Sequence, residues 1–224
     1  VTFKHAIWDI EGYYPNIPKP VIMSAMKAIL ESVKESENVR GVMQVSVPLT
    51  KSGSSHIGRY TKEDTDKKDT HVTIGSKLML EVLEFCLSNA ISKVDGKLIL
   101  QLEGIPQGDN LSPAIAIGTA AYCEDVWMKQ QSNEDKGKVF IQRYMDDIQC
   151  VYVNDSDTKL FVGRFEEECY PKPLKLTNDD NDHFLECEVM ELDGLVHFKH
   201  WNKNKGLDTQ LFYKGKNFYS VGPL

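Results

Sequence analysis

The fold of this chain is decided by residues 139–153, which read VFIQRYMDDIQCVYV. Two apolar runs, 139–145 and 148–153, flank Asp146 and Asp147, and this pattern predicts two antiparallel strands joined by a tight turn. Adjacent carboxylates in such a turn repel each other, so they face water or a cation. In isolation the pair is also typical of an ordinary Asp-rich turn, so whether it has a function depends on the rest of the chain.

Two other segments carry polar residues next to predicted elements. The first, Asp9-Ile10-Glu11-Gly12-Tyr13-Tyr14, follows the apolar, strand-like run 1–10. The second, GIPQGDNLSP at 104–113, leads into a helix rich in small residues. Ser112 is expected to cap that helix, with Pro113 at its first position. Together with the hairpin, these segments place Asp9, Asp146 and Asp147 at one sheet edge, where three carboxylates can bind two hard divalent cations ~3.5–4 Å apart.

The remaining pattern predicts an α+β fold, with an antiparallel sheet covered by helices on one face. Helical spacing occurs over 19–38, 75–92 and 157–169. Asp95-Gly96 and Asp193-Gly194 lie between short apolar runs and predict two more hairpins.

The composition restricts the classes of protein to which this chain can belong. The 224 residues include 26 Lys and Arg against 33 Asp and Glu, a net charge of −7, whereas a free-standing nucleic-acid binder is usually basic. The longest apolar runs are too short for a membrane span. Five cysteines without a CxxC motif indicate reduced thiols and an intracellular location, cytoplasmic or nuclear. The chain begins with Val1, so we expect it to be a piece of a longer protein.

Taken in order, the three segments resemble motifs A, B and C of reverse transcriptases. Tyr144-Met145-Asp146-Asp147 is similar to motif C, and the pattern Pro-Gln-Gly-x-x-x-Ser-Pro over 106–113 is similar to motif B. The resemblance covers roughly residues 1–200 and implies the palm of a right-hand polymerase, an RNA-directed DNA polymerase of the retroelement type. It implies two Mg²⁺ or Mn²⁺ ions as cofactors, and dNTPs with a primed RNA or DNA template as partners.

The resemblance also assigns roles by position. As metal ligands it implies the carboxylates of Asp9, Asp146 and Asp147 and the backbone carbonyl of Ile10, with Asp146 favoured over Asp147 within the pair. As substrate contacts it implies Tyr14 under the sugar, where its ring excludes a ribose 2′-hydroxyl, Gln107 and Gly108 at the incoming nucleotide, and Met145 beside the primer end. Tyr13, by contrast, is expected to be a core aromatic.

The same resemblance predicts the domain organisation. Residues 1–183 would form the palm, with 40–74 as an insertion toward the fingers. Residues 184–224 would form a primer-grip hairpin and a connection toward the thumb, because Phe184-Leu185-Glu186-Cys187 loosely resembles motif E. Fingers and thumb regions that supply basic surface would lie outside these residues, which offers an account of the acidic charge. We therefore expect residues 1–224 to be inactive alone.

Several alternatives stay open. The long spacing between motifs A and B resembles Penelope-type and other retroelement enzymes, but motif B does not favour Penelope, so the clade is undecided. An RNA-dependent RNA polymerase palm is the first rival, and Met145 and Tyr14 argue against it. A non-catalytic, reverse-transcriptase-like scaffold is the second rival, and the presence of all three carboxylates argues against that.

Overall fold

The computed structural model describes residues 1–36, 44–48, 59–61, 71–178, 182–201, 212–213 and 216–217. The chain divides into two compact units, each built from separate segments. The first unit contains Val1–Asp9, Asn133–Val162 and Thr177–Leu224, and the second contains Ile10–Ser132 and Gly163–Leu176. Most of the expected insertion at 40–74, and most of the expected thumb connection after residue 201, lie outside the described residues.

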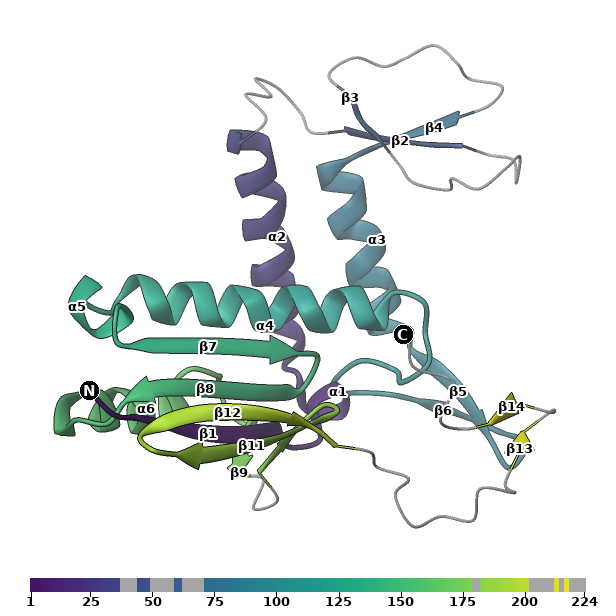
Figure 1. Ribbon diagram of the computed structural model, residues 1–224. Coiled ribbons are helices and arrows are strands. Elements are labelled where there is room, and N and C mark those ends of the chain that lie inside the picture. The colour runs from purple at the N-terminus through teal and green to yellow at the C-terminus, as the bar shows by residue number, and fades with distance from the viewer. Residues whose placement is uncertain are drawn as a thin grey trace. The chain divides into compact units, whose positions relative to one another are not determined.

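The first unit is centred on a four-stranded sheet in the order β7-β8-β1-β9 (Figure 1). Its strands are β1 (Phe3–Ile10), β7 (Val139–Tyr144), β8 (Asp147–Val153) and β9 (Leu176–Asn178). The central strands β1 and β8 run antiparallel, and β7 pairs with β8 on its other side. Ile7, Trp8, Ile148 and Cys150 from the two central strands are buried, so apolar side chains fix this pair in place.

A second sheet of the first unit has the order β10-β11-β12 and is called the hairpin sheet below. Its strands are β10 (His183–Phe184), β11 (Cys187–Leu192) and β12 (Leu195–His200). Phe184 and Val189 of this sheet form one buried cluster with Ile7 of β1. Two small elements complete the first unit, α5 (Asn133–Lys136) and the pair β13 (Phe212–Tyr213) and β14 (Lys216–Asn217).

Helix α6 (Ser156–Glu168) begins in the first unit and ends in the second. The backbone N–H of Thr158 donates to Asp155 Oδ1 at 2.7 Å, which satisfies a donor of the first turn. This hydrogen bond is the main cause that lowers the pKa of Asp155 from its ordinary value. Asp155 therefore caps the helix as a carboxylate.

The second unit consists mainly of helices. They are α1 (Tyr13–Asn16), α2 (Lys19–Ser36), α3 (Ser76–Ser88) and α4 (Ser112–Lys129). Its strands are β2 (Gln44–Pro48), β3 (Arg59–Thr61) and β4 (His71–Gly75), which form one sheet in the order β3-β2-β4, and the hairpin of β5 (Ile91–Val94) and β6 (Lys97–Leu100).

Small residues explain how α4 packs against α2. A Cβ atom on Gly118 of α4 would lie 2.7 Å from Met26 Cε of α2, closer than side-chain atoms approach. Ala116 and Ala120 on α4 and Ala25 on α2 are fully or almost fully buried. The helix rich in small residues therefore allows its neighbour to approach closely, as its composition suggests.

Most predicted elements are confirmed within one to four residues, including three helices and the hairpins at 95–96 and 193–194. The hairpin over 139–153 is confirmed with its turn shifted by one residue, because Asp147 already pairs with Tyr144 and the turn consists of Met145 and Asp146. The expected cap of α4 is wrong by one position. Leu111, which offers no side-chain hydrogen bond, is the N-cap, and Ser112 is already helical. Ser112 is instead the first helical residue, and its hydroxyl ties the helix start to the preceding loop by donating to the Pro106 carbonyl at 2.5 Å.

Candidate active site

Asp9 and Asp147 are brought together by the pairing of β1 with β8. The register places Asp9 opposite Asp147 and Trp8 opposite Ile148. Side chains directly opposite each other in an antiparallel pair lie on the same face, with Cβ atoms about 4.5–5.5 Å apart. Both aspartates are half-buried. Two carboxylates thus share one face of the sheet at the end of β1.

The turn next to this pair contains Met145 and Asp146. Tyr144 and Asp147 are the last paired residues of the β7–β8 ladder, so only two residues connect the strands. Met145 has φ +57°, a left-handed conformation that is uncommon for a residue with a side chain. Arg143 Nη1 donates to the Met145 carbonyl at 3.1 Å, which supports this strained turn. Asp146 is half-buried at the tip, one residue before the paired Asp147.

The end of β1 is fixed on its other side by β9. Thr177 Oγ1 donates to the Asp9 carbonyl at 3.3 Å. The side chain of Ile10, the last residue of β1, is completely buried. Asp9 therefore lies on a strand that has a neighbouring strand at each edge, and the buried side chain of the next residue, Ile10, anchors the end of that strand.

In the second unit, the contacts of Tyr13 and Tyr14 differ. Tyr13 is buried and its hydroxyl donates to the Ala116 carbonyl at 2.6 Å, which confirms the expected core role. Tyr14 is half-buried and its ring meets that of Tyr13 edge-on, with centroids 6.1 Å apart. The Tyr14 carbonyl accepts a hydrogen bond from Ile105 N–H at 2.9 Å.

This backbone hydrogen bond joins the segment after β1 to the loop that carries Gln107 and Gly108. Gly104, with φ +67°, makes the approach possible, since a Cβ there would lie 2.4 Å from the Tyr14 carbonyl oxygen. Gln107 and Gly108 are exposed, and Gly108 has φ +96°. Tyr14 and the Gln107 loop are therefore neighbours within the second unit, as expected from motifs A and B.

The donor chemistry of Asp9, Asp146 and Asp147 suits a hard divalent cation, because carboxylate oxygens are the ligands that Mg²⁺ prefers. The positions of these three carboxylates match a metal site less well than their donor chemistry does. Within the described part of the chain, no three His, Cys, Asp or Glu side chains form a group that could hold a metal ion. Asp9 and Asp147 are paired by register, and Asp146 belongs to the turn. The residues therefore fit the metal by chemistry, and two of the three fit it by position.

Some residues of the site were not predicted from the sequence. Arg143 lies two residues before Met145 in the hairpin, and its position next to an acidic turn was a usable signal. Gly104 is the first residue of the segment that resembles motif B, but its close approach to Tyr14 depends on tertiary structure.

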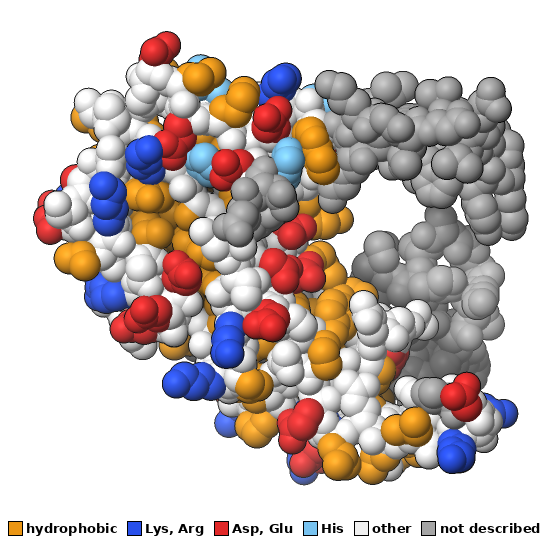
Figure 2. All heavy atoms as spheres, turned by 90° about the horizontal axis from the view of Figure 1, so that it is seen from below, with side chains coloured by type: hydrophobic (Ala, Val, Ile, Leu, Met, Phe, Trp, Pro, Cys, Tyr) orange, Lys and Arg blue, Asp and Glu red, His pale blue; other side chains and the backbone are white. Residues whose placement is uncertain are grey.

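Among the described helices, none is long and apolar enough to cross a lipid bilayer. Figure 2 shows Asp and Glu mixed with Lys and Arg on one face of the molecule.

Comparison with known proteins supports the fold. No protein-family model matches the chain, and no curated protein matches it. Telomerase from Candida albicans in complex with the TWJ fragment of telomeric RNA is similar in structure, with a TM-score of 0.56, 17% identity and 88% of this chain covered. Telomerase from Candida tropicalis with the same RNA fragment gives a TM-score of 0.56 at 13% identity over 95% of this chain, and its apo form gives 0.54 at 12% over 88%.

The chain spans about a third of the length of these telomerases, since 32% of each is covered. The structural similarity establishes the fold, and sequence identities this low leave the activity open. The expected fold class, a polymerase palm built from antiparallel strands and helices, is thereby confirmed.

Proposed function

We propose that this chain is the palm region of a reverse transcriptase that synthesises DNA on a nucleic-acid template. The observation that carries the proposal is the register of β1 and β8, which sets Asp9 opposite Asp147 beside the Met145-Asp146 turn. Like charges directly opposite each other destabilise a sheet, so a pair at this position calls for a functional reason. The similarity to telomerases solved with telomeric RNA supports a nucleic-acid partner.

In this proposal Asp9, Asp146 and Asp147, with the Ile10 carbonyl, would hold two Mg²⁺ or Mn²⁺ ions, which would supply positive charge at the attacking and leaving oxygens. The oxygen of a primer 3′-hydroxyl, which gives its proton to water, bonds to the α-phosphorus of a dNTP. The bond from that phosphorus to the departing pyrophosphate breaks. Tyr14 and Gln107 contact the nucleotide, and Met145 lies beside the primer end.

The hairpin sheet and the segment that follows it belong to the same proposal. We assign residues 184–224 to a primer-grip hairpin and a connection toward the thumb, and fingers and thumb regions of a longer protein to the remaining phosphate contacts. An intracellular site of action, nuclear or cytoplasmic, fits the absence of any disulfide among the five cysteines. The retroelement clade, Penelope-like or other, is left open by this proposal.

One observation favours a second function, a non-catalytic scaffold of reverse-transcriptase type. The three carboxylates do not form a metal-binding group among the residues that the structure describes. A scaffold would retain the fold and the nucleic-acid surface without needing Asp146 or Asp147.

Primer extension by the protein at its natural full length separates the two functions. The assay uses matched RNA and DNA templates with Asp146→Asn, Asp147→Asn and, as control, Asp125→Asn on the surface of α4. Catalysis predicts a loss of at least about 100-fold for either site variant, because a lost metal ligand removes several kcal/mol of transition-state stabilisation. The control should extend normally. Normal extension by both folded site variants would contradict catalysis, and nucleic-acid binding without extension in the unchanged protein would favour the scaffold.

A further inference from the structure

One edge of β1 is closed partly by a side chain. Along its C-terminal half this edge meets β9, where Thr177 contacts the Asp9 carbonyl. Along the N-terminal half, Phe3 N–H donates to the Gly194 carbonyl at 2.7 Å, and His5 N–H donates to Glu191 Oε1 at 3.1 Å. Alternate N–H groups along a strand point to the same edge. The turn at Gly194 and the carboxylate of Glu191 thus occupy the place of a neighbouring strand.

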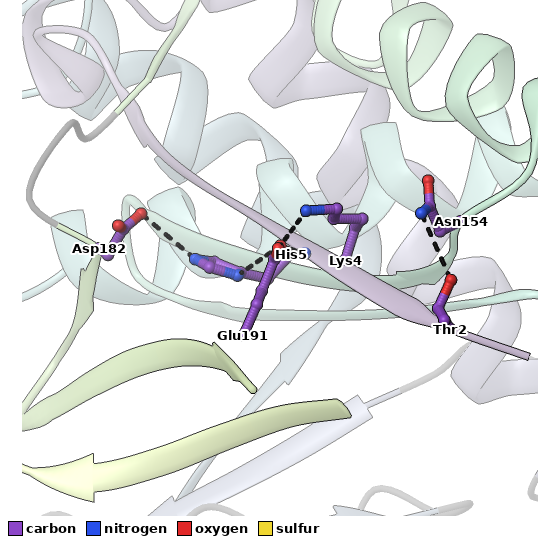
Figure 3. Close-up of polar contacts among 6 residues, drawn as sticks. All are labelled: Thr2, Lys4, His5, Asn154, Asp182 and Glu191. Carbon is purple, nitrogen blue, oxygen red and sulfur yellow. Dashed lines mark hydrogen bonds and ion pairs between the residues drawn. The ribbon is translucent and has the colours of Figure 1, made fainter. Parts of the chain in front are cut away.

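Glu191 of β11 is also the centre of a charged cluster (Figure 3). Lys4 Nζ donates to its carboxylate, and His5 Nδ1 lies 3.2 Å from Glu191 Oε1 without hydrogen-bond geometry. The other ring nitrogen, His5 Nε2, lies 3.2 Å from Asp182 Oδ1. We call Lys4, His5, Asp182 and Glu191 the Glu191 clamp.

The charge state of Glu191 suits an acceptor of hydrogen bonds from β1. Burial raises the pKa of its carboxyl, but the hydrogen bonds from Lys4 and from the His5 N–H lower it more, so the pKa lies below its ordinary value. Glu191 is therefore ionised at neutral pH. An ionised carboxylate is a stronger acceptor for the His5 N–H than a neutral group.

The apolar contact between the hairpin sheet and β1 is a small one. Among the residues that the structure describes, one buried cluster joins Ile7 to Phe184 and Val189, with Leu185 and Val196 partly buried against it. Most of β12 is exposed. Hydrophobic burial scales with the apolar area removed from water, so a small cluster leaves much of the docking to polar contacts. The clamp is therefore well placed to set where the hairpin sheet lies on β1.

We propose that Glu191 is a positioning residue that fixes the hairpin sheet against β1, the strand that carries Asp9. The inference rests on the proposed function, in which the hairpin sheet contacts the primer and Asp9 belongs to the reaction centre. Glu191 touches neither substrate nor metal in this view. It acts as a hydrogen-bond acceptor for the open edge of β1, and so holds the primer-contacting sheet at a fixed distance from the carboxylates.

Two substitutions at Glu191 and one matched control test the role. Glu191→Leu removes the acceptor, whereas Glu191→Gln keeps an oxygen for the His5 N–H. Glu134→Gln is the control, since Glu134 lies on α5, outside the hairpin sheet, and also pairs with a lysine, Lys138 at 3.4 Å. The readouts are kcat and KM for primer–template and for dNTP in the natural full-length protein, and amide hydrogen exchange of the hairpin sheet.

We expect Glu191→Leu to raise KM for primer–template about fivefold, the factor that corresponds to one hydrogen bond. kcat and KM for dNTP should change less than about twofold, because only primer placement is altered. The amide of Val189, which donates to the Asp182 carbonyl at 2.8 Å, should exchange faster by a similar factor. Glu191→Gln should keep a KM for primer–template close to that of the unchanged protein, and Glu134→Gln should stay close to the unchanged protein in all readouts.

An unchanged KM for primer–template in a folded Glu191→Leu protein would overturn the proposal. So would a lower kcat with unchanged KM values and a lower stability, since that result describes a smaller folded fraction and a purely structural residue. If Glu191→Leu does not fold, Lys4→Met combined with Glu191→Gln weakens the clamp by a milder route, and the same shift in KM is expected. If the unchanged protein synthesises no DNA, the proposed function fails, and hydrogen exchange alone judges whether Glu191 fixes the hairpin sheet.

Discussion

Asp9 lies directly opposite Asp147 across the antiparallel pair of β1 and β8. Both carboxylates are half-buried on one face of the sheet, and their charges oppose the pairing that brings them together. The free energy of this arrangement therefore depends on what shares the face with them, which makes the pair the most direct target for experiments.

Divalent cations should raise the thermal stability of the chain. A ligand that binds only the folded state stabilises it by about 2.7 kcal/mol at a concentration 100 times its Kd. We expect Mg²⁺ or Mn²⁺ to increase the Tm in a thermal unfolding assay. The effect should disappear in Asp9→Asn and persist in Asp125→Asn, a surface variant on α4. An equal increase in all three proteins would indicate unspecific binding.

The two adjacent tyrosines should respond differently to substitution. Tyr14→Val should lower the ratio of kcat/KM for dNTP over rNTP, because the smaller side chain leaves room for a 2′-hydroxyl. Tyr13→Phe removes the hydrogen bond to the Ala116 carbonyl and should cost about 1 kcal/mol of stability with no change in that ratio. Incorporation of dGTP and GTP opposite one template base measures both ratios. A ratio unaffected by Tyr14→Val would remove the main argument for DNA synthesis over RNA synthesis.

Gly104→Ala should disrupt the contact between Tyr14 and the Gln107 loop. The added Cβ would lie 2.4 Å from two carbonyl oxygens, those of Tyr14 and Pro15, and φ is +67°. Both effects are unfavourable for alanine, so we expect a loss of more than about 1 kcal/mol in a chemical denaturation experiment. Gly163→Ala provides the control, since its Cβ would meet no atom within 4 Å and the residue lies inside α6. A neutral Gly104→Ala would mean that this loop lies further from Tyr14.

The acid sensitivity of folding should depend on Glu191. Because its pKa is lowered in the folded state, the carboxylate stabilises the fold above its ordinary pKa of 4.5, and this contribution is lost as pH falls through the folded value. Glu191→Gln should therefore be less stable than the unchanged chain at pH 7, and the difference should shrink below pH 4.5. Urea denaturation across this pH range gives both curves. Parallel curves would show that Glu191 has the same pKa folded and unfolded.

Cys150 should be chemically inert in the folded chain. Burial on β8 raises the pKa of its thiol to about 12, so almost no reactive thiolate is present near neutral pH. Cys86 and Cys187 are half-buried and should be alkylated first by iodoacetamide. Peptide mapping by mass spectrometry after labelling at pH 8, with and without urea, distinguishes the three. Rapid labelling of Cys150 without denaturant would indicate frequent opening of the β1–β8 pair.

Local features of this protein were predictable from the sequence by itself. The hairpin at 139–153 follows from two apolar runs and a two-residue turn, and the helices follow from apolar spacing over single segments. An α+β fold with antiparallel strands was likewise predicted from patterning, and Tyr13 was expected to be a core aromatic. The palm was predicted from the resemblance of three motifs to reverse transcriptases. The presence of Asp9, Asp146 and Asp147 was visible, but their arrangement was not.

Only the tertiary structure decided which carboxylates meet, because strand register depends on packing along the whole strand rather than on any local pattern. The β1–β8 register sets Asp147 opposite Asp9, and Asp146 belongs to the turn. Packing also took the Ser112 hydroxyl from its expected cap to the Pro106 carbonyl. Glu191 closes the edge of β1 from 186 residues away in the chain, and no periodicity or turn signal carries such information. Contacts at that distance exist only after the strands have paired, which is why the sequence predicted the elements and the fold determined the site.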